Sequence, residues 1–273
     1  NNGDEIVLLK GIHTCDTNIT IVSWRDDDGG IRFVQRDGTT AISGIFIHGA
    51  NNTRNDNVIY DCKHTKRAFA FMSENEGLNT VLSNFSISNG SAYFGGGVYI
   101  ESEAQPIFNH VIWIRNLAQG FGGGVYIKDS HTKPTFNNCT FQENKASSSN
   151  YGGGGVYIRC QAQAICNHVV WSRNVAQGGG GGVYITSSNT NPTFNNCTFQ
   201  ENEAQNSQYG GGGVYIESQA QPIFNHVIWI RNVAQGGGGG VYITSSNTNP
   251  TFNNCTFQEN KAPNSNYGGG GVY

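Results

Sequence analysis

A repeating unit of 58 residues constrains this chain more than any other feature. The tripeptide Val-Tyr-Ile recurs through the last two thirds of the sequence, and Val272 and Tyr273 begin one further copy. The six complete copies begin at Val98, Val125, Val156, Val183, Val214 and Val241. Their spacing alternates between 27 and 31 residues, so each unit has a short half and a long half. This period predicts a solenoid in which each half-unit forms one coil and stacks on the next.

The composition of each half-unit indicates strands. Each half contains three short runs of β-branched and aromatic residues, separated by Pro, Asn and Gly, and the Gly runs disfavour helices. We therefore predict an all-β, right-handed parallel β-helix of about ten coils. Residues 1–97 lack the period but also consist of short strand-like runs separated by Asn and Gly, and they are expected to form irregular coils. The regular part, 98–273, is expected to continue the same solenoid through units 98–155, 156–213 and 214–271.

Stacking of the coils would place equivalent side chains in columns about 4.8 Å apart. One expected column alternates Trp and Phe: Trp113, Phe141, Trp171, Phe199, Trp229 and Phe257. A second holds small apolar side chains: Val111, Cys139, Val169, Cys197, Val227 and Cys255. A third is expected at a bend, where polar side chains could bond along the stack: His110, Asn138, His168, Asn196, His226 and Asn254.

The pairing of GGGVYI with PTFNNCTFQENKA resembles the repeats of bacterial β-helix surface proteins, including the polymorphic outer membrane proteins of chlamydiae. Their FxxN motif is matched by Phe141 to Asn144 and its later equivalents, whereas their Gly-Gly-Ala motif has Gly here in place of Ala. The stretch from Arg67 to Gly90 resembles the first coils of pectin-lyase-like proteins. The resemblance implies a secreted or surface-exposed protein, commonly an adhesive one.

The leading functional hypothesis is a non-catalytic, extracellular structural or adhesive solenoid that forms filaments or stalks by end-to-end or lateral self-association. The chain starts on a strand-like run and stops within a coil at Tyr273, which would expose unpaired strand edges, so either the parent protein continues or copies stack end to end. Charged residues are only 13% of the chain and the net charge is −3, which disfavours nucleic acid as a partner. No apolar run is long enough for a transmembrane helix.

The alternative is a β-helix that binds or cleaves carbohydrates. A lyase of this fold needs an acidic Ca²⁺ cluster and a basic residue on one face. Asp26 to Asp28 read more simply as a surface turn, and the Glu101 and Glu103 pair is not kept in later units. The histidines of the third column would lie two coils apart, too far to share a zinc ion. We therefore expect no catalytic residue, cofactor or metal.

Strand alternation places the tyrosine of every Val-Tyr-Ile on the outer side of its strand. The resulting stripe is a candidate site for sugars or for lateral contact, although the rings could instead stack on one another. The stripe consists of Tyr99, Tyr126, Tyr157, Tyr184, Tyr215 and Tyr242. Ile112, Ile114, Ile228 and Ile230 flank inward positions, so some of them are expected to be exposed.

Two modifications are also considered. Cys160 and Cys166 both replace other residues in a single coil, which suggests a local disulfide, with independent drift as the alternative. Cys15 and Cys62 have no assigned partner. Candidate N-glycosylation sites are Asn18, Asn51, Asn84 and Asn89. Asn138 and its equivalents also lie in such motifs, but their expected place in a ladder argues against modification.

Overall fold

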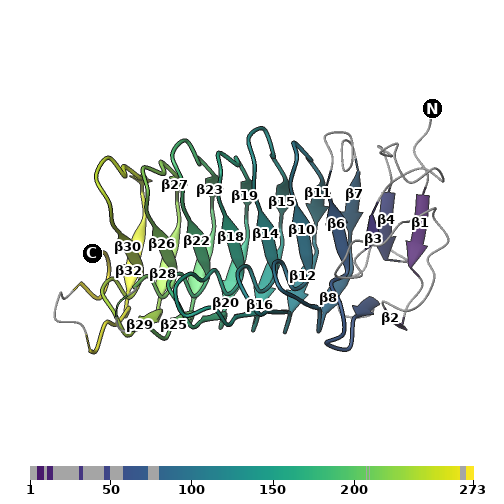
Figure 1. Cartoon of the computed structure of the whole chain (residues 1–273), viewed down its shortest axis with the longest axis horizontal. Coiled ribbons are helices and arrows are strands. Elements are labelled where there is room, and N and C mark those ends of the chain that lie inside the picture. The colour runs from purple at the N-terminus through teal and green to yellow at the C-terminus, as the bar shows by residue number, and fades with distance from the viewer. Residues whose placement is uncertain are drawn as a thin grey trace.

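The computed structural model describes residues 5–8, 11–14, 31–32, 46–49, 58–72, 80–206, 208, 210–264 and 269–273. These residues form a rod with strands lying across its long axis (Figure 1). All strand pairs are parallel, and each strand pairs with its equivalent in the next coil. The predicted parallel β-solenoid is confirmed. It has about seven turns, so the predicted ten coils are too many.

Four sheets run along the rod, and their strands occur in chain order within each sheet. Sheet A contains β1 (Glu5–Leu8), β4 (Phe46–Gly49), β7 (Val81–Ser83), β11 (Ile107–Asn109), β15 (Thr135–Asn137), β19 (Ile165–Asn167), β23 (Thr193–Asn195), β27 (Ile223–Asn225) and β31 (Thr251–Asn253). Sheet B contains β2 (Gly11–Thr14), β5 (Val58–Asp61), β8 (Ser86–Ser88), β12 (Ile112–Ile114), β16 (Thr140–Gln142), β20 (Val170–Ser172), β24 (Thr198–Gln200), β28 (Ile228–Ile230) and β32 (Thr256–Gln258).

Sheet C contains β3 (Ile31–Arg32), β6 (Phe69–Phe71), β10 (Val98–Ile100), β14 (Val125–Ile127), β18 (Val156–Ile158), β22 (Val183–Ile185), β26 (Val214–Ile216) and β30 (Val241–Ile243). Because β6 pairs with β10, the sheet continues from the irregular N-terminal part into the regular repeats.

The fourth sheet was not expected, because three strands per coil were predicted. Its strands have two residues each: β9 (Ser91–Ala92), β13 (Leu117–Ala118), β17 (Lys145–Ala146), β21 (Val175–Ala176), β25 (Glu203–Ala204) and β29 (Val233–Ala234). The second residue of each is a buried Ala, so each of these strands contributes one small inward side chain. Two-residue strands have too short an alternation to be read from sequence.

The core includes both predicted columns. In the Trp and Phe column, Trp113 lies 4.5 Å from Phe141 and Phe141 lies 5.5 Å from Trp171, measured between ring centroids. The same two spacings recur in the next unit, with ring planes within 9° of parallel. The small apolar column is also buried, from Val111 to Val227. Both predictions are confirmed, and coil-on-coil stacking is the source of the core.

Two asparagine ladders run along the rod, and neither was identified from sequence. The inner ladder consists of Asn116, Asn144, Asn174, Asn202, Asn232 and Asn260, the asparagines of the FxxN motif. Each side-chain amide donates to a backbone carbonyl of the preceding coil, for example Asn174 to Phe141 at 2.8 Å, and all but the last, Asn260, also donate to the next Oδ1 at 2.9 Å. Its Oδ1 in turn accepts the backbone N–H of the preceding member, so the ladder satisfies the turn between sheet B and the fourth sheet.

The outer ladder lies at the end of sheet A: Asn109, Asn137, Asn167, Asn195, Asn225 and Asn253. Neighbouring side chains are joined by hydrogen bonds of 2.8–2.9 Å. Our prediction placed this bonding one residue later, at the column of His110 and Asn138. Those residues instead have φ near +52° and exposed side chains, because the left-handed turn points them away from the stack.

Candidate functional site

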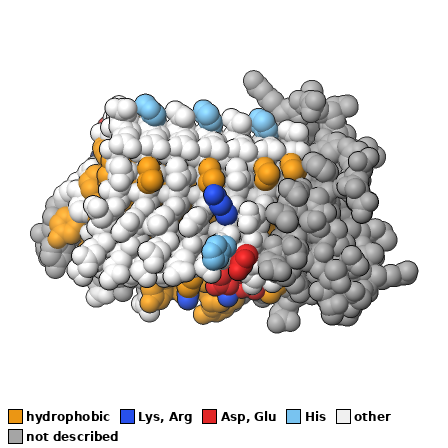
Figure 2. All heavy atoms as spheres, turned by 90° about the horizontal axis from the view of Figure 1, so that it is seen from above, with side chains coloured by type: hydrophobic (Ala, Val, Ile, Leu, Met, Phe, Trp, Pro, Cys, Tyr) orange, Lys and Arg blue, Asp and Glu red, His pale blue; other side chains and the backbone are white. Residues whose placement is uncertain are grey.

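The outer face of sheet B is the best candidate for a contact surface. Of its two outward columns, the one that begins with Ile112 above Thr140 alternates aliphatic side chains with threonine. The other begins with Ile114 above Gln142 and is mixed, since Ser172 lies between Gln142 and Gln200. Ile228 is 42% exposed, which confirms that part of the predicted aliphatic set reaches solvent. A second aliphatic row lies on sheet A, where Ile223 is 38% exposed. Figure 2 shows one side of the rod, with separate hydrophobic side chains in a row beside a row of histidines and few charges.

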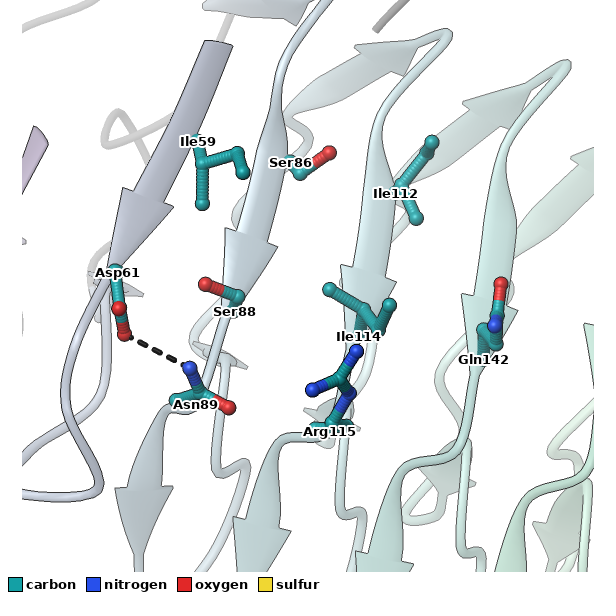
Figure 3. A pocket seen from close by; sticks show the side chains of 9 residues that line it. All are labelled: Ile59, Asp61, Ser86, Ser88, Asn89, Ile112, Ile114, Arg115 and Gln142. Carbon is teal, nitrogen blue, oxygen red and sulfur yellow. Dashed lines mark hydrogen bonds between the residues drawn. The ribbon is translucent and has the colours of Figure 1, made fainter. Parts of the chain in front are cut away.

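A pocket of about 370 Å³ lies at the N-terminal end of this face, over β5, β8, β12 and β16 (Figure 3). Two serines, Ser86 and Ser88, form a low floor between the aliphatic side chains of neighbouring coils. The complete lining is Ile59, Asp61, Ser86, Ser88, Asn89, Ile112, Ile114, Arg115 and Gln142. The pocket therefore combines aliphatic walls with a polar end, as small-ligand sites commonly do.

The polar end of the pocket holds both charges and free hydrogen-bonding capacity. Asp61 Oδ1 accepts a hydrogen bond from Asn89 Nδ2 at 3.0 Å and one from the backbone N–H of Lys63 at 2.9 Å. Ser88 is 6% exposed, and its hydroxyl has no hydrogen-bond partner among the described residues. The guanidinium of Arg115 extends over β12, and its Nε lies 3.4 Å from Glu143. Oxygen-rich, uncharged ligands fit this mixture of donors and acceptors.

A column of alternating charge follows the same face along the edge next to the inner asparagine ladder. It consists of Arg115, Glu143, Arg173, Glu201, Arg231 and Glu259, which we call the Arg–Glu column. Every member has φ between 53° and 56°, so each side chain leaves the coil at an equivalent left-handed turn. Glu143 lies 3.1 Å from Arg173, and Arg231 lies 3.4 Å from Glu201. The charges are therefore held in one line along the rod.

The tyrosine stripe does not form the exposed site that was considered. Tyr126, Tyr157, Tyr184 and Tyr215 are at most 3% exposed. They stack at 4.5–5.4 Å in a second hydrophobic cluster outside sheet C, with Tyr99 and Tyr242 half-buried at its ends. The stacking alternative is the one the structure shows.

The glycine-rich loops cover these rings. A Cβ added to Gly179 would lie 2.6 Å from the ring of Tyr215, so glycine is what lets this loop lie flat on the tyrosine. Phe94 and Phe121 complete the cover, each stacked at 5.0 Å on the tyrosine of a neighbouring coil. Strand alternation correctly placed the tyrosines outside the sheet, but it carried no information about what lies over them.

Burial of the tyrosine stack should change how it titrates. Desolvation raises the pKa of Tyr157 and Tyr184, and a hydrogen bond to Glu101 adds to this effect on the pKa of Tyr99. A raised folded-state pKa favours folding below the unfolded value near 10, and this contribution is lost as the pH rises above it. Absorbance titration at 295 nm should show part of the 12 tyrosines ionising only above pH ~11, together with unfolding. Normal ionisation of all of them in a folded protein would contradict the buried stack.

The predicted disulfide between Cys160 and Cys166 is wrong, because both thiols are free in the structure. Cys166 lies on the inward side of β19 and is buried, whereas Cys160 lies at a left-handed turn with φ 55° and accepts a hydrogen bond from Arg159. Their side chains thus point in different directions. Cys62 is disulfide-bonded, and Cys15 lies outside the described residues.

Thiol labelling should separate these cysteines. Burial raises the pKa of Cys139 and Cys197 to about 12 and that of Cys166 well above its usual range. At pH 8 iodoacetamide should therefore modify Cys160 in the folded protein and leave the three buried thiols intact until denaturant is added. Peptide mapping by mass spectrometry gives the readout. Labelling of all four at similar rates would show that the core is not closed.

The remaining candidates concern metal ligands and N-glycosylation. Among the described residues, no three His, Cys, Asp or Glu side chains come together as metal ligands would. Asn84 and Asn89 lie half-buried at turns, and the amide nitrogen of Asn89 that would carry a glycan bonds Asp61. Asn18 and Asn51 lie outside the described residues. Asn138, Asn196 and Asn254 have exposed side chains, contrary to their expected place in a ladder.

The described residues also contain no helix with the length and hydropathy needed to cross a bilayer.

Comparison with known families assigns the fold a name. A model described as "Right handed beta helix region" matches residues 37–161 and 147–273. The chain therefore belongs to the right-handed β-helix family. No curated protein and no solved structure matches the chain.

Proposed function

We propose that this chain is a non-catalytic, extracellular structural or adhesive rod that associates with copies of itself. The family includes both enzymes and non-enzymes, so the argument depends on the residues of this chain. The main observation in favour of a non-catalytic rod is that its polar side chains form their contacts along the rod axis. In the regular coils both asparagine ladders and most neighbours in the Arg–Glu column bond equivalent positions of adjacent coils along the axis. Catalysis instead requires unlike groups that converge on one point.

Two further features favour an extracellular rod. Cys62 is disulfide-bonded, and such bonds persist mainly in oxidising compartments. The outer columns repeat with the coils, so one contact that forms at a single level can form at every equivalent level. Repetition of this kind produces extended contacts from weak individual ones.

Electron microscopy and sedimentation of the purified chain test this proposal. We expect rods that associate side by side or end to end as the concentration rises. We also expect no unsaturated products from acidic polysaccharides. Dispersed monomers at high concentration would argue against self-association, and released sugar products would establish the enzymatic alternative.

A second function, saccharide binding, is favoured by the pocket on sheet B. Its aliphatic walls could face the C–H groups of a sugar, while Asp61 and the Ser88 hydroxyl, which has no partner in the part of the chain that the structure describes, could meet its hydroxyl groups. Titration with neutral oligosaccharides should shift the NMR signals of the Ile59 and Ile112 methyl groups at millimolar ligand, and Ser88→Val should weaken the shifts. Unchanged signals would exclude this pocket as the sugar site.

A further inference from the structure

The outer face of sheet B has a charge pattern that complements a second copy of itself in one orientation. We propose that two copies of this chain pair through this face with their rods antiparallel. The inference rests on the proposed self-association and names its surface and geometry. The face comprises the two outward columns of β12, β16, β20, β24, β28 and β32 and the Arg–Glu column along one edge.

The alternation of charge selects the direction. Six successive coils, which we call levels, carry Arg, Glu, Arg, Glu, Arg and Glu in the Arg–Glu column. A two-fold axis parallel to the strands reverses the order of levels and keeps the charged edge facing the charged edge. Arg115 then opposes Glu259 of the second copy, Arg173 opposes Glu201, and Arg231 opposes Glu143. All levels are therefore complementary at once.

Other orientations lose this match. A two-fold axis along the rod would place the Arg–Glu column against the opposite edge of the face, where exposed His110 and Asn138 begin their column. An antiparallel pair shifted by one coil would place Arg against Arg. Shifts of two coils restore the complementarity. Opposed like charges disfavour wrong registers, so the pattern restricts both direction and register.

The sizes of the outward side chains alternate along the rod in the same way as the charges. The outward column farther from the Arg–Glu column is formed by the first residue of each strand: Ile112, Thr140, Val170, Thr198, Ile228 and Thr256. Reversal places Ile228 opposite Thr140 and Ile112 opposite Thr256, so large side chains meet small ones. The 42% exposure of Ile228 gives this contact apolar surface to bury.

The contact should be weak. Six strands about 4.8 Å apart span only about 24 Å of the rod, which is short for a tight dimer. Exposed ion pairs add little to affinity. The charges thus determine orientation, and appreciable association requires high concentration.

Cysteine crosslinking tests the geometry directly. In a Cys160→Ser background, chains with Thr140→Cys mixed with chains with Ile228→Cys should form a disulfide-linked heterodimer under mild oxidation. Thr140→Cys mixed with Thr198→Cys is the matched control, because these levels never meet in a complementary register. Each single variant alone should stay unlinked. Crosslinking of the control pair, or of a variant with itself, would overturn the antiparallel arrangement.

Charge reversal gives an independent arm. One variant carries Glu143→Arg, Glu201→Arg and Glu259→Arg, and the other carries Arg115→Glu, Arg173→Glu and Arg231→Glu. Sedimentation should show self-association at least about tenfold weaker for each variant alone, a free-energy loss of about 1.4 kcal/mol, and recovery in their mixture. If the wild type associates but neither variant changes its association and no specific crosslink forms, this inference is overturned and the proposed function stands. No association of the wild type would contradict the proposed function itself.

Discussion

Replacement of Asn174 by alanine is expected to destabilise the protein by about 3–5 kcal/mol, because it interrupts the buried asparagine ladder. Asn174 Oδ1 accepts both the backbone N–H and the side-chain amide of Asn144, at 3.0 and 2.9 Å. Its own amide donates to the Phe141 carbonyl at 2.8 Å. Alanine would leave several buried polar groups without partners, and each costs about 1–3 kcal/mol.

Asn167 provides the matched control for this substitution. It lies in the same coil and belongs to the outer ladder, where its amide donates to Asn137 at 2.8 Å. Because it is only half-buried, water can replace its lost partners, and Asn167→Ala should cost less than about 1.5 kcal/mol. Denaturant unfolding followed by circular dichroism measures both. Equal costs at the two positions would contradict the role assigned to the inner ladder.

Trp171→Ala should cause a loss of similar size, about 3–5 kcal/mol, through a cavity at the centre of the aromatic column. The Trp171 side chain is fully buried and stacks on Phe199 at 4.5 Å and on Phe141 at 5.5 Å. Its removal would interrupt the column between two coils. Loss of protection from hydrogen exchange should therefore spread along the rod from this coil.

Trp171→Phe separates the cavity from the chemistry of the indole. Phe already occupies the levels above and below in the same column, at Phe141 and Phe199. The indole Nε1–H of Trp171 has no hydrogen-bond partner among the described residues, so its loss removes a buried unsatisfied donor. We expect a change within about 1.5 kcal/mol. A cost as large as that of alanine would show that the column requires the full indole volume.

The sequence predicted the features that depend on the repeat itself. Alignment of the short half-unit with the long one placed Trp113 above Phe141 and Val111 above Cys139, because in a solenoid equivalent positions in neighbouring coils become neighbours in space. The coil count was less accurate, because the first 97 residues have no period by which to count coils.

Features that depend on turns and on covering loops could not be predicted in this way. The ladder forms at Asn137 and not at Asn138 because Asn138 has a left-handed backbone conformation. The ladder position cannot be predicted without knowing the φ of that residue. The burial of Tyr184 depends on aromatic side chains of neighbouring coils, such as Tyr157 and the loop residue Tyr151, which alternation along one strand does not describe. The glycine runs were interpreted as breaks, yet glycines such as Gly179 also give the tyrosine rings their space.

The contact surface was predicted only in part. Exposure of Ile228 followed from the alternation of inward and outward positions. The pocket and the Arg–Glu column were not foreseen, because Asp61 and Arg115 are far apart in sequence and only coil stacking brings them to one face. Recognition of alternating Arg and Glu at the residue before each ladder asparagine would have revealed the column.

Pulsed electron paramagnetic resonance between spin labels along one column tests the coil stacking most directly. The exposed turn residues His110, His168 and His226 are suitable label sites, substituted in pairs by cysteine in the Cys160→Ser background. The separation should be about 10 Å between His110 and His168 and about 19 Å between His110 and His226, apart from the label linkers. A distance that rises evenly with each 58-residue unit is the predicted result. Distances that do not increase from the first pair to the second would contradict the solenoid.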